Sequence, residues 1–592
     1  MFQTFQATTS PEQGPPRLKA LREALEKEGF DAFIVPRADA HQGEYVADRD
    51  ARLSWLTGFT GSAGFCIVLQ DIAGVFVDGR YRVQVKEQVD TSYFTPVHWP
   101  ETKPEDWLKE KLTSGKVAFD PWLFTKLQID EITEGLKGTD ITLVPSANFV
   151  DAIWEDQPAA PAGKVEAYPI ELSGKRSPDK RQEIAEKLRD KGHTAAILTL
   201  PDSICWLLNI RGTDIPRIPI VQCFAVIHAD ARVDLFIDQT RVDHLGPDPA
   251  ITVKPPDSFA DAIAQLDGPV RVGAGSAPLA VSQILQQAEV EIAYAMDPCI
   301  LRKACKNETE ISGTKQAHIR DAQAMVRFLA WLDAQTPGTF TEIDVATSLE
   351  GFRAQTNALR DVSFETISGA GPNGAIVHYR VTDDTNRTVK DGDLMLVDSG
   401  GQYVDGTTDI TRTIPIGQPT EEQKKCFTLV LQGMIAISQA RFPRGVAGRD
   451  LDALARAPLW RHGLDYDHGT GHGVGTYLSV HEGPQRLSRM SEVPLKEGMI
   501  LSNEPGYYRE GAFGIRIENL IVVQQAAKLG DNRDQLSFET ITWVPIDRRL
   551  IATDMLAPHE RDWINAYHAE IANKISVEGA AKDWLEAATA PL

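Results

Sequence analysis

Two aspartates in the C-terminal half of the sequence are spaced so that a hairpin would bring them together. Asp398 ends the apolar, strand-like run 394–397. Asp409 follows 11 residues later, beyond the turn signal Asp405–Gly406, so the strand after that turn would run antiparallel to the first. Two unpaired carboxylates side by side repel each other and titrate as a coupled pair, and a metal ion removes that cost. The alternative is that Asp409 only pairs with nearby Arg412.

Histidines cluster in a glycine-rich segment further along the chain. Three of the 13 histidines, His468, His472 and His481, lie within 14 residues. Four glycines between positions 468 and 475 exclude a regular helix and let the backbone approach a ligand closely. A lone histidine is more often structural, but a cluster of imidazoles is typical of metal binding or proton transfer.

Two glutamates follow in apolar, strand-like segments. Glu504 comes directly after the run 499–503. Arg516 and Glu518 stand two residues apart, so in a strand they would share one face while Ile517 points to the other. A structural ion pair between Arg516 and Glu518 is the alternative to a functional role.

These segments combine into one predicted site for two metal ions. Four carboxylates supply four negative charges and one imidazole adds a neutral nitrogen, so two divalent cations would make the site neutral. Such an oxygen-rich set suits Mn²⁺, Mg²⁺, Co²⁺ or Zn²⁺ and suits soft, thiolate-preferring metals poorly. Two ions roughly 3.5–4 Å apart can activate a water molecule and polarise a carbonyl group. The predicted ligands are Asp398, Asp409, His472, Glu504 and Glu518.

The segment Gly369–Gly374 matches the dinucleotide-binding pattern GxGxxG. That pattern requires a helix immediately after it, so that the pyrophosphate lies at a helix N-terminus. The residues that follow, 375–379, read as a strand. We therefore expect a plain turn here and no nucleotide site.

The first 300 residues contain two similar halves. In each half an amphipathic helix ends at a glycine and an apolar strand follows, over 16–35 with Gly29 and over 181–198 with Gly192. This repeat predicts two related α/β domains in tandem, separated in the proline- and alanine-rich stretch 157–164.

A third domain is predicted to begin near Lys306 and to contain a duplicated α+β plan. Two helices precede the Asp398 strand, the second opened by a capping-box pattern at Thr341, and two more follow it. The tail from Asp554 is predicted to be a helical extension. The predicted helices cover 308–334, 341–355, 421–440 and 448–462. The predicted domain ranges are 1–162, 163–304 and 305–592.

The composition of the chain limits the classes of molecule that it is expected to bind. The chain has 61 basic and 83 acidic residues, a net charge of -22, which argues against nucleic acid or an anionic membrane as the main partner. Residues 1–16 lack the basic start and apolar block of a secretory signal, and no apolar run approaches the roughly 18 residues of a membrane helix. The six cysteines are scattered, which favours a reduced, cytoplasmic location.

The order of the predicted ligands, Asp, Asp, His, Glu, Glu, resembles that of the pita-bread metallopeptidases, which include methionine aminopeptidase, prolidase and aminopeptidase P. Over nearly its whole length the sequence is similar to the three-domain, cytosolic type of Xaa-Pro aminopeptidase. This resemblance implies two creatinase-like N-terminal α/β domains before a pita-bread catalytic domain with a C-terminal extension. The segments that carry it are 39–42, 61–64, 78–81, 468–475 and 511–519.

The resemblance implies a role for each ligand. Asp398 would bind one metal and His472 the other. Glu504 would join His472 as a ligand and would also act as general base or proton shuttle. Asp409 and Glu518 would bridge both metals.

The resemblance also implies a second set of residues, which contact substrate. His378 and His481 would stabilise the tetrahedral intermediate, and His468 would shape the pocket on the proline side. Arg80 would reach the substrate from the first domain, and Arg516 is grouped with these substrate-binding residues.

The implied enzyme is a metal-dependent aminopeptidase that hydrolyses the N-terminal Xaa-Pro bond of peptides through a water or hydroxide bridging two divalent metals. Its metal would be Mn²⁺, with Zn²⁺ or Co²⁺ as alternatives, and it would form a cytoplasmic homodimer. An Xaa-Pro bond has no N–H, so recognition needs a pocket that fits the proline ring.

Other readings stay open. Prolidase shares all five ligands but accepts only dipeptides, and generally has two domains. Methionine aminopeptidase lacks a large N-terminal region, and creatinase-like hydrolases lack the ligands. A catalytically inactive binding protein on the same fold is the alternative from a different class.

Overall fold

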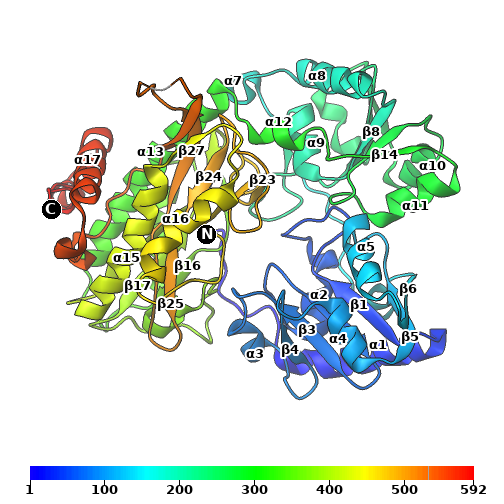
Figure 1. Ribbon diagram of the computed structural model, residues 1–592, viewed down its shortest axis with the longest axis horizontal. Helices are drawn as coiled ribbons and strands as arrows, with labels where there is room; N and C mark the ends of the chain where they lie inside the picture. Colours follow the sequence, from blue (N-terminus) through cyan, green and yellow to red (C-terminus); the bar gives the residue numbers. More distant parts are fainter. Residues whose placement is uncertain (531) are drawn as a thin grey trace. The chain divides into compact units, whose positions relative to one another are not determined.

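The computed structural model describes residues 1–530 and 532–592, and their contacts divide the chain into two compact units (Figure 1). The N-terminal unit comprises Thr8–Ile170 and Lys175–Ile300. The C-terminal unit comprises Leu301–Leu592 together with the short segments Met1–Ala7 and Glu171–Gly174.

The N-terminal unit contains two six-stranded sheets with one topology. Their strand orders are β4-β3-β2-β1-β5-β6 and β12-β11-β10-β8-β13-β14, and the parallel and antiparallel pairings correspond strand by strand. Helix α1 (Gly14–Glu28) ends at Gly29, whose positive φ of 73° suits glycine, and β1 (Ala32–Pro36) follows. Helix α8 (Ser177–Asp190) precedes β8 (Ala195–Leu198) in the same way. The predicted tandem α/β repeat is confirmed.

The remaining strands of these two sheets are β2 (Phe65–Leu69), β3 (Ala73–Val77), β4 (Thr95–His98), β5 (Ser114–Phe119), β6 (Asp140–Pro145), β10 (Phe224–His228), β11 (Val233–Phe236), β12 (Ile251–Lys254), β13 (Val270–Val272) and β14 (Ile292–Tyr294). The longer helices packed with them are α2 (Arg52–Thr57), α4 (Pro104–Lys111), α5 (Lys126–Gly135), α9 (Pro201–Leu208) and α11 (Leu279–Gln287).

The C-terminal unit contains the four long helices that the sequence predicts, two before and two after the Asp398 strand. Thr341 caps the second of them and forms a capping box with Asp344, as predicted. The four helices are α13 (Glu308–Asp333), α14 (Glu342–Ala354), α15 (Glu421–Ser438) and α16 (Gly448–Trp460).

Two antiparallel sheets in this unit carry the predicted metal ligands. The order of the smaller sheet is β16-β17-β20, and that of the larger sheet is β21-β28-β27-β24-β22-β23. A separate two-stranded sheet joins β25 and β26. The strands are β16 (Ile367–Ala370), β17 (Leu394–Ser399), β20 (Ile410–Pro415), β21 (Arg441–Pro443), β22 (Gly471–Gly473), β23 (Glu482–Leu487), β24 (Ile500–Asn503), β25 (Gly506–Arg509), β26 (Phe513–Arg516), β27 (Asn519–Gln525) and β28 (Gln535–Thr540).

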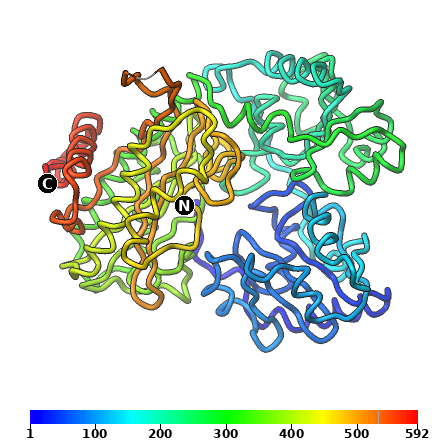
Figure 2. The backbone as a smooth tube through the Cα atoms, in the orientation of Figure 1, coloured from blue at the N-terminus to red at the C-terminus, as the bar shows by residue number. Residues whose placement is uncertain are grey.

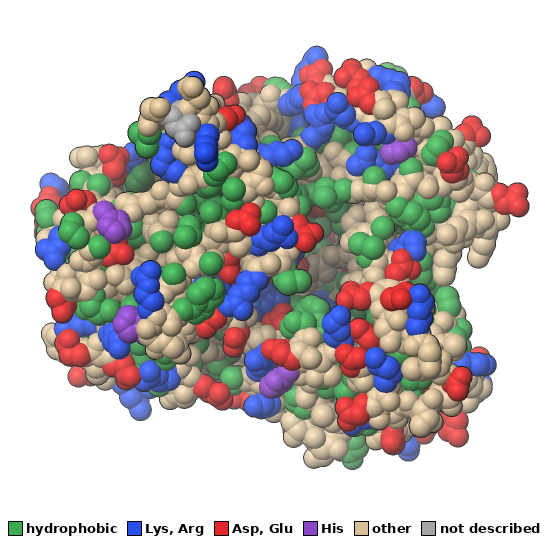
Figure 3. Space-filling view, viewed as in Figure 1, with side chains coloured by type: hydrophobic (Ala, Val, Ile, Leu, Met, Phe, Trp, Pro, Cys, Tyr) green, Lys and Arg blue, Asp and Glu red, His purple; other side chains and the backbone are tan. Residues whose placement is uncertain are grey.

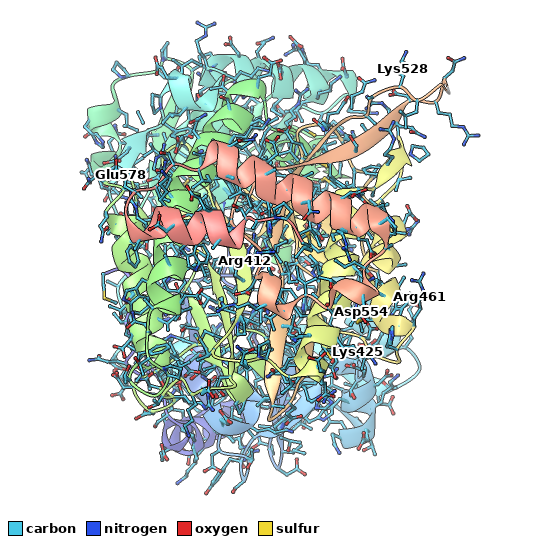
Figure 4. The ribbon with its side chains drawn as sticks, turned by 90° about the vertical axis from the view of Figure 1, so that its left-hand side faces the viewer. Arg412, Lys425, Arg461, Lys528, Asp554 and Glu578 are labelled. Carbon is cyan, nitrogen blue, oxygen red and sulfur yellow. The ribbon has the colours of Figure 1, made fainter. Side chains whose placement is uncertain are left out.

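The predicted helical extension is present as α17 (Pro558–Lys574) and α18 (Ala580–Ala588), which cross the outer face of the unit in Figure 4. Ile564, Ile571 and Leu585 of these helices belong to the same buried apolar core as the strands β17 and β20. No helix in the described part of the chain has the length and hydropathy needed to cross a bilayer. Acidic and basic side chains are intermingled on the face that Figure 3 shows.

The first seven residues, which the predicted first domain includes, pack with the C-terminal unit. Met1–Ala7 belongs to the C-terminal unit, and the trace in Figure 2 begins there. The reason is a buried carboxylate: Glu350 accepts hydrogen bonds from the backbone N–H groups of Phe2, at 2.6 Å, and Gln3, at 3.2 Å. The domain boundaries after 162 and 304 stay predictions.

The prediction of a strand over 375–379 is wrong. Gly371, with a positive φ of 53°, and Pro372 begin a short 3₁₀ helix over Gly371–Ala375, and a turn follows. The buried carboxylate of Glu342 fixes this path, because it accepts hydrogen bonds from the backbone N–H of Ala370 and the hydroxyl of Tyr379.

Arg516 and Glu518 do not share one continuous strand. Arg516 ends β26, and Glu518 precedes β27, which belongs to a different sheet. The backbone N–H of Glu518 donates to the carbonyl of Thr411 on β20, at 3.1 Å, so the chain turns between the two sheets at this point.

Candidate metal centre

The hairpin predicted for the two aspartates is present. Strands β17 and β20 pair antiparallel, with Ser399 opposite Ile410, so Asp398 on one strand lies close to Asp409 at the start of the other. Both side chains are buried. The Oδ1 atoms of both are buried without a hydrogen-bond partner among the described residues.

The alternative pairing of Asp409 with Arg412 is wrong. Arg412 points its guanidinium away from the hairpin toward the C-terminal extension, where Figure 4 labels it. Its described hydrogen bonds end on the carbonyls of Thr411, Glu518, Val544 and Pro545 and on the side chains of Asn519 and Tyr567. The Asp409 carboxylate is therefore not neutralised by Arg412 and can bind another cation.

His472 lies on β22 of the larger sheet, and Glu504 directly follows the neighbouring strand β24. The Nε2 atom of His472 lies 3.4 Å from Glu504 Oε1 and 3.5 Å from Asp409 Oδ2. Its Nδ1 atom lies 2.9 Å from the carbonyl of Gly473, which fixes the tautomer and leaves Nε2 for a metal. The hydroxyl of Ser502 accepts from the backbone N–H of His472 and donates to Glu504 Oε1.

Glu518 completes the cluster. Its Oε2 atom accepts a hydrogen bond of 2.9 Å from the hydroxyl of Thr411, and its Oε1 atom is buried without a hydrogen-bond partner among the described residues. Ligand atoms of Asp409, His472 and Glu518 all lie within 4.8 Å of one another.

The electrostatics of this cluster fit divalent cations. Burial, followed by the charges of neighbouring carboxylates, raises the pKa of Asp398 to about 6 and holds the pKa of Glu518 well above its usual range. Burial also raises the pKa of Glu504. Buried carboxylate oxygens that lack a hydrogen-bond partner, together with the Nε2 atom of an imidazole that faces them, are the donors that Mn²⁺, Zn²⁺ and related ions take. The residues present therefore fit a pair of metal ions.

Arg516 holds Asp398 in place. Only 1% of its surface is exposed, and its Nη2 atom donates to Asp398 Oδ2 at 2.6 Å. Its other nitrogens donate to the hydroxyls of Tyr508, at 2.6 Å, and Thr411, at 3.2 Å. The predicted alternative, an ion pair of Arg516 with Glu518, is thus replaced by a pair with Asp398.

The predicted substrate-contacting histidines surround the same cluster. The His481 ring packs edge-on against the ring of ligand His472, with centroids 4.3 Å apart. The Nε2 atom of His468 lies 2.8 Å from the hydroxyl of Tyr508, which also contacts Arg516. His378 directly follows Val377, whose carbonyl accepts from Arg516 at 3.3 Å.

Arg80 lies in the N-terminal unit, whereas the other predicted site residues belong to the C-terminal unit. Its guanidinium forms an ion pair of 2.7 Å with Asp78 and stands 5.2 Å from the ring of Tyr81. Its contact with substrate stays a prediction.

Several residues that shape the site were not predicted. Ser502 and Thr411 lie on strands two residues from a ligand that directly flanks the strand, a spacing that could have identified them. Arg456 gave no such signal. It lies on α16, is buried against Asp452, and donates to the carbonyl of His468 at 2.6 Å.

The buried donor set defines a class of protein, a metalloenzyme. Comparison with known protein families supports this class. Residues 312–525 match the family described as "Metallopeptidase family M24", and residues 534–592 match the "C-terminal region of peptidase_M24". The "Creatinase/Prolidase N-terminal domain" matches twice, over 17–153 and 156–310. The predicted fold class is confirmed.

Similar proteins identify the branch of the family. A probable Xaa-Pro aminopeptidase P of Aspergillus fumigatus is 40% identical over 610 residues, which covers 97% of this chain and 92% of the relative. Aminopeptidase P2 of Arabidopsis thaliana is 38% identical over 616 residues, covering 95% and 86%. The crystal structure of an X-prolyl aminopeptidase from Caenorhabditis elegans, described as a cytosolic enzyme with a di-nuclear active site, has a TM-score of 0.91 at 31% identity and covers 98% and 99%. The chain belongs to metallopeptidase family M24, among the Xaa-Pro aminopeptidases, as the sequence predicted.

Proposed function

We propose that this protein is a two-metal aminopeptidase that removes the N-terminal residue from peptides with proline in the second position. The observation that carries the proposal is the buried cluster of four carboxylates and one imidazole, with three carboxylate oxygens that lack a hydrogen-bond partner among the described residues. It stands in a chain whose full-length relatives are named Xaa-Pro aminopeptidases.

We propose that Asp398 would hold one metal ion, that His472 and Glu504 would hold the other, and that Asp409 and Glu518 would serve both. Two divalent ions are supported by the family and by the di-nuclear site of the neighbouring structure. We propose Mn²⁺ as the native ion, with Zn²⁺ or Co²⁺ as alternatives. When bound, such a pair polarises the scissile carbonyl and lowers the pKa of a water molecule.

The protein's own groups would then orient the substrate and move a proton. Glu504, whose Oε1 accepts a hydrogen bond from the hydroxyl of Ser502, would take the proton from the attacking water. His378 and His481 would donate to the oxygen on which negative charge develops. His468, held by Tyr508, would line the proline pocket. Arg80 would contact substrate from the N-terminal unit.

Arg516 is better assigned to positioning than to substrate binding. All three of its side-chain nitrogens donate to protein groups, among them Asp398 and Tyr508, and the side chain is buried. A guanidinium in that position fixes the orientation of a metal ligand, as outer partners of metal ligands generally do.

The test is a panel of peptides, Xaa-Pro, Xaa-Pro-Xaa and Xaa-Ala-Xaa, assayed with and without Mn²⁺. We expect release of the first residue from the proline tripeptide and a severe loss of kcat/KM for the alanine peptide, because alanine leaves the ring pocket unfilled. Hydrolysis confined to the dipeptide would make the protein a prolidase. Binding of metal without hydrolysis of any peptide would favour an inactive binding protein.

We also propose a homodimer and a cytoplasmic location. The scattered positions of the six cysteines in the sequence support a reducing compartment, and the neighbouring structure is described as a cytosolic enzyme. Large apolar side chains such as Trp460 and Leu454 on α16 are more than two-fifths exposed, at 44% and 41%, and would suit a subunit interface. Light scattering would show a particle of twice the 65.2 kDa chain.

A further inference from the structure

Three charged side chains are buried together beside the metal centre. Glu482 is 4% exposed, and its two carboxylate oxygens pair with two different lysines. Oε2 lies 2.7 Å from Nζ of Lys303, which is 2% exposed, and Oε1 contacts Nζ of Lys306, which is 6% exposed. We call these three residues the lysine–glutamate triad.

The two lysines come from the start of the C-terminal unit. Lys303 lies in helix α12 (Ile300–Ala304), and Lys306 lies between that helix and α13. Lys306 is itself fixed, because its backbone N–H donates to the carbonyl of Gly498 at 3.0 Å and its ammonium donates to the carbonyl of Lys303 at 2.9 Å. The triad therefore ties a well-anchored segment to Glu482.

Glu482 occupies the position next to the predicted substrate contact. His481 directly precedes it, and in the sheet Glu482 lies opposite Gly473, the neighbour of ligand His472. A Cβ atom placed on Gly475 would lie 3.3 Å from Glu482 Oε2, so the carboxylate packs against the loop that follows the metal ligand. Anchoring Glu482 thus fixes the backbone on which the His481 ring is mounted.

Burial of three ions needs a reason beyond stability. Removing ions from water is costly, and a buried ion pair is often no more stabilising than apolar side chains of the same size. What such a pair supplies is a fixed geometry, because each charge left without its partner in the interior is strongly unfavourable. A histidine that must meet a developing charge requires that kind of fixed position.

We infer that the lysine–glutamate triad is a positioning device that holds His481 in the geometry required for turnover. This inference rests on the proposed function of His481 as a substrate contact. Glu482 acts through His481 and does not itself touch the reacting atoms, so its loss should affect kcat more than KM and should leave both metal ions in place.

The experiment is a double-mutant cycle between Glu482→Gln and His481→Ala. Metal content by elemental analysis and kcat with an Xaa-Pro-Xaa peptide are measured for each protein. We expect Glu482→Gln to retain two metals and to lose about 10²-fold in kcat, the cost of a misplaced catalytic contact. In the His481→Ala background the same change should cost less than about twofold, because coupled residues are not additive.

A second variant covers failure to fold, because Glu482→Gln leaves two buried ammonium groups without their carboxylate. The triple variant K303M/E482Q/K306M removes all three charges and keeps the volumes, so it should fold and still lose kcat. Asp214→Asn is the matched control: Asp214 is buried and pairs with Arg241 at 2.7 Å in the N-terminal unit. It should lower the melting temperature and leave kcat unchanged.

The outcomes separate the inference from the proposed function. Equal losses from Glu482→Gln in both backgrounds, or no loss in the wild-type background, would overturn the positioning role. No loss from His481→Ala would overturn the proposed role of His481 and the inference with it. Histidine-selective ¹³C NMR gives a readout that does not depend on activity: we expect Glu482→Gln to shift the ring signal of His481, and an unmoved signal would overturn the inference even if no peptide were cleaved.

Discussion

Replacing Arg516 by methionine removes the cation that forms an ion pair with Asp398. Methionine keeps much of the arginine's volume, so the packing of the buried side chain changes little while its hydrogen bonds to Asp398, Tyr508 and Thr411 are lost. If Arg516 positions a metal ligand, the change should weaken metal binding and lower stability. If Arg516 binds substrate, it should raise KM.

The size of the stability loss follows from burial. Removing one partner of a buried ion pair costs about 3–5 kcal/mol. The C-terminal unit has about 300 residues, and unfolding entropy is about 2.1 cal/mol/K per residue, so the melting entropy is about 0.6 kcal/mol/K. The metal-free variant should therefore unfold about 5–8 °C below the metal-free wild type.

Metal affinity should fall in a pH-dependent manner. Burial raises the pKa of Asp398 to about 6 even with Arg516 present, and Arg516 is the main group that lowers it. Without Arg516 the pKa of Asp398 rises further, so a proton competes with the metal at neutral pH, and affinity should recover as pH rises. The raised pKa also sets how the stability of the metal-free protein depends on pH. Protonation of Asp398 stabilises the folded state, fully below the ordinary pKa of 3.8, and this stabilisation is lost as pH rises through about 6.

Calorimetry under a chelator gives the melting temperature, and Mn²⁺ titrations at pH 6.5 and 8.5 give the affinities. Arg509→Met is the matched control, because Arg509 lies in the same β25–β26 hairpin but is 36% exposed and pairs with exposed Glu422. Its effect should stay below about 1 kcal/mol. An Arg516→Met protein with wild-type melting temperature and metal affinity but a raised KM would refute the positioning argument.

Three further outcomes are expected. Glu504→Gln should keep the fold and lose about 10²- to 10⁴-fold in kcat, since it removes the proposed base; a loss of less than tenfold would assign the proton transfer elsewhere. His378→Ala should lower kcat about 10²-fold with two metals retained by elemental analysis, and a loss of metal would make it a ligand. Burial lowers the pKa of His472, but Asp409 and Glu504 raise it to about 9, above the unfolded value of 6.5. The protonated imidazole therefore stabilises the metal-free fold at low pH, and the free energy of unfolding should fall by about 3 kcal/mol as pH rises from 6.5 to 9. Urea midpoints under a chelator at both pH values test this, and an unchanged midpoint would contradict it.

The parts of the molecule that could be predicted from sequence are those whose determinants are local. Capping boxes, glycine helix ends and the Asp398–Asp409 hairpin each depend on residues within about a dozen positions of one another. The strand predicted over 375–379 was wrong because its path is set by Glu342, more than 25 residues away, which accepts from Ala370 and Tyr379. An apolar run alone does not show whether such a distant acceptor exists.

Arg412 shows why proximity in sequence misleads at a functional site. It stands three residues from Asp409, yet its guanidinium bonds to Glu518, 106 residues away, and to Pro545, 133 residues away. Had it paired with Asp409, it would have neutralised the carboxylate that a metal ion needs. Metal ligands can be recognised in the sequence from their own chemistry, because only a few residue types carry carboxylate or imidazole donors. The residues that hold them, such as Arg516, Arg412 and Lys306, use ordinary hydrogen bonds available to any arginine or lysine, so only their positions in the folded chain distinguish them.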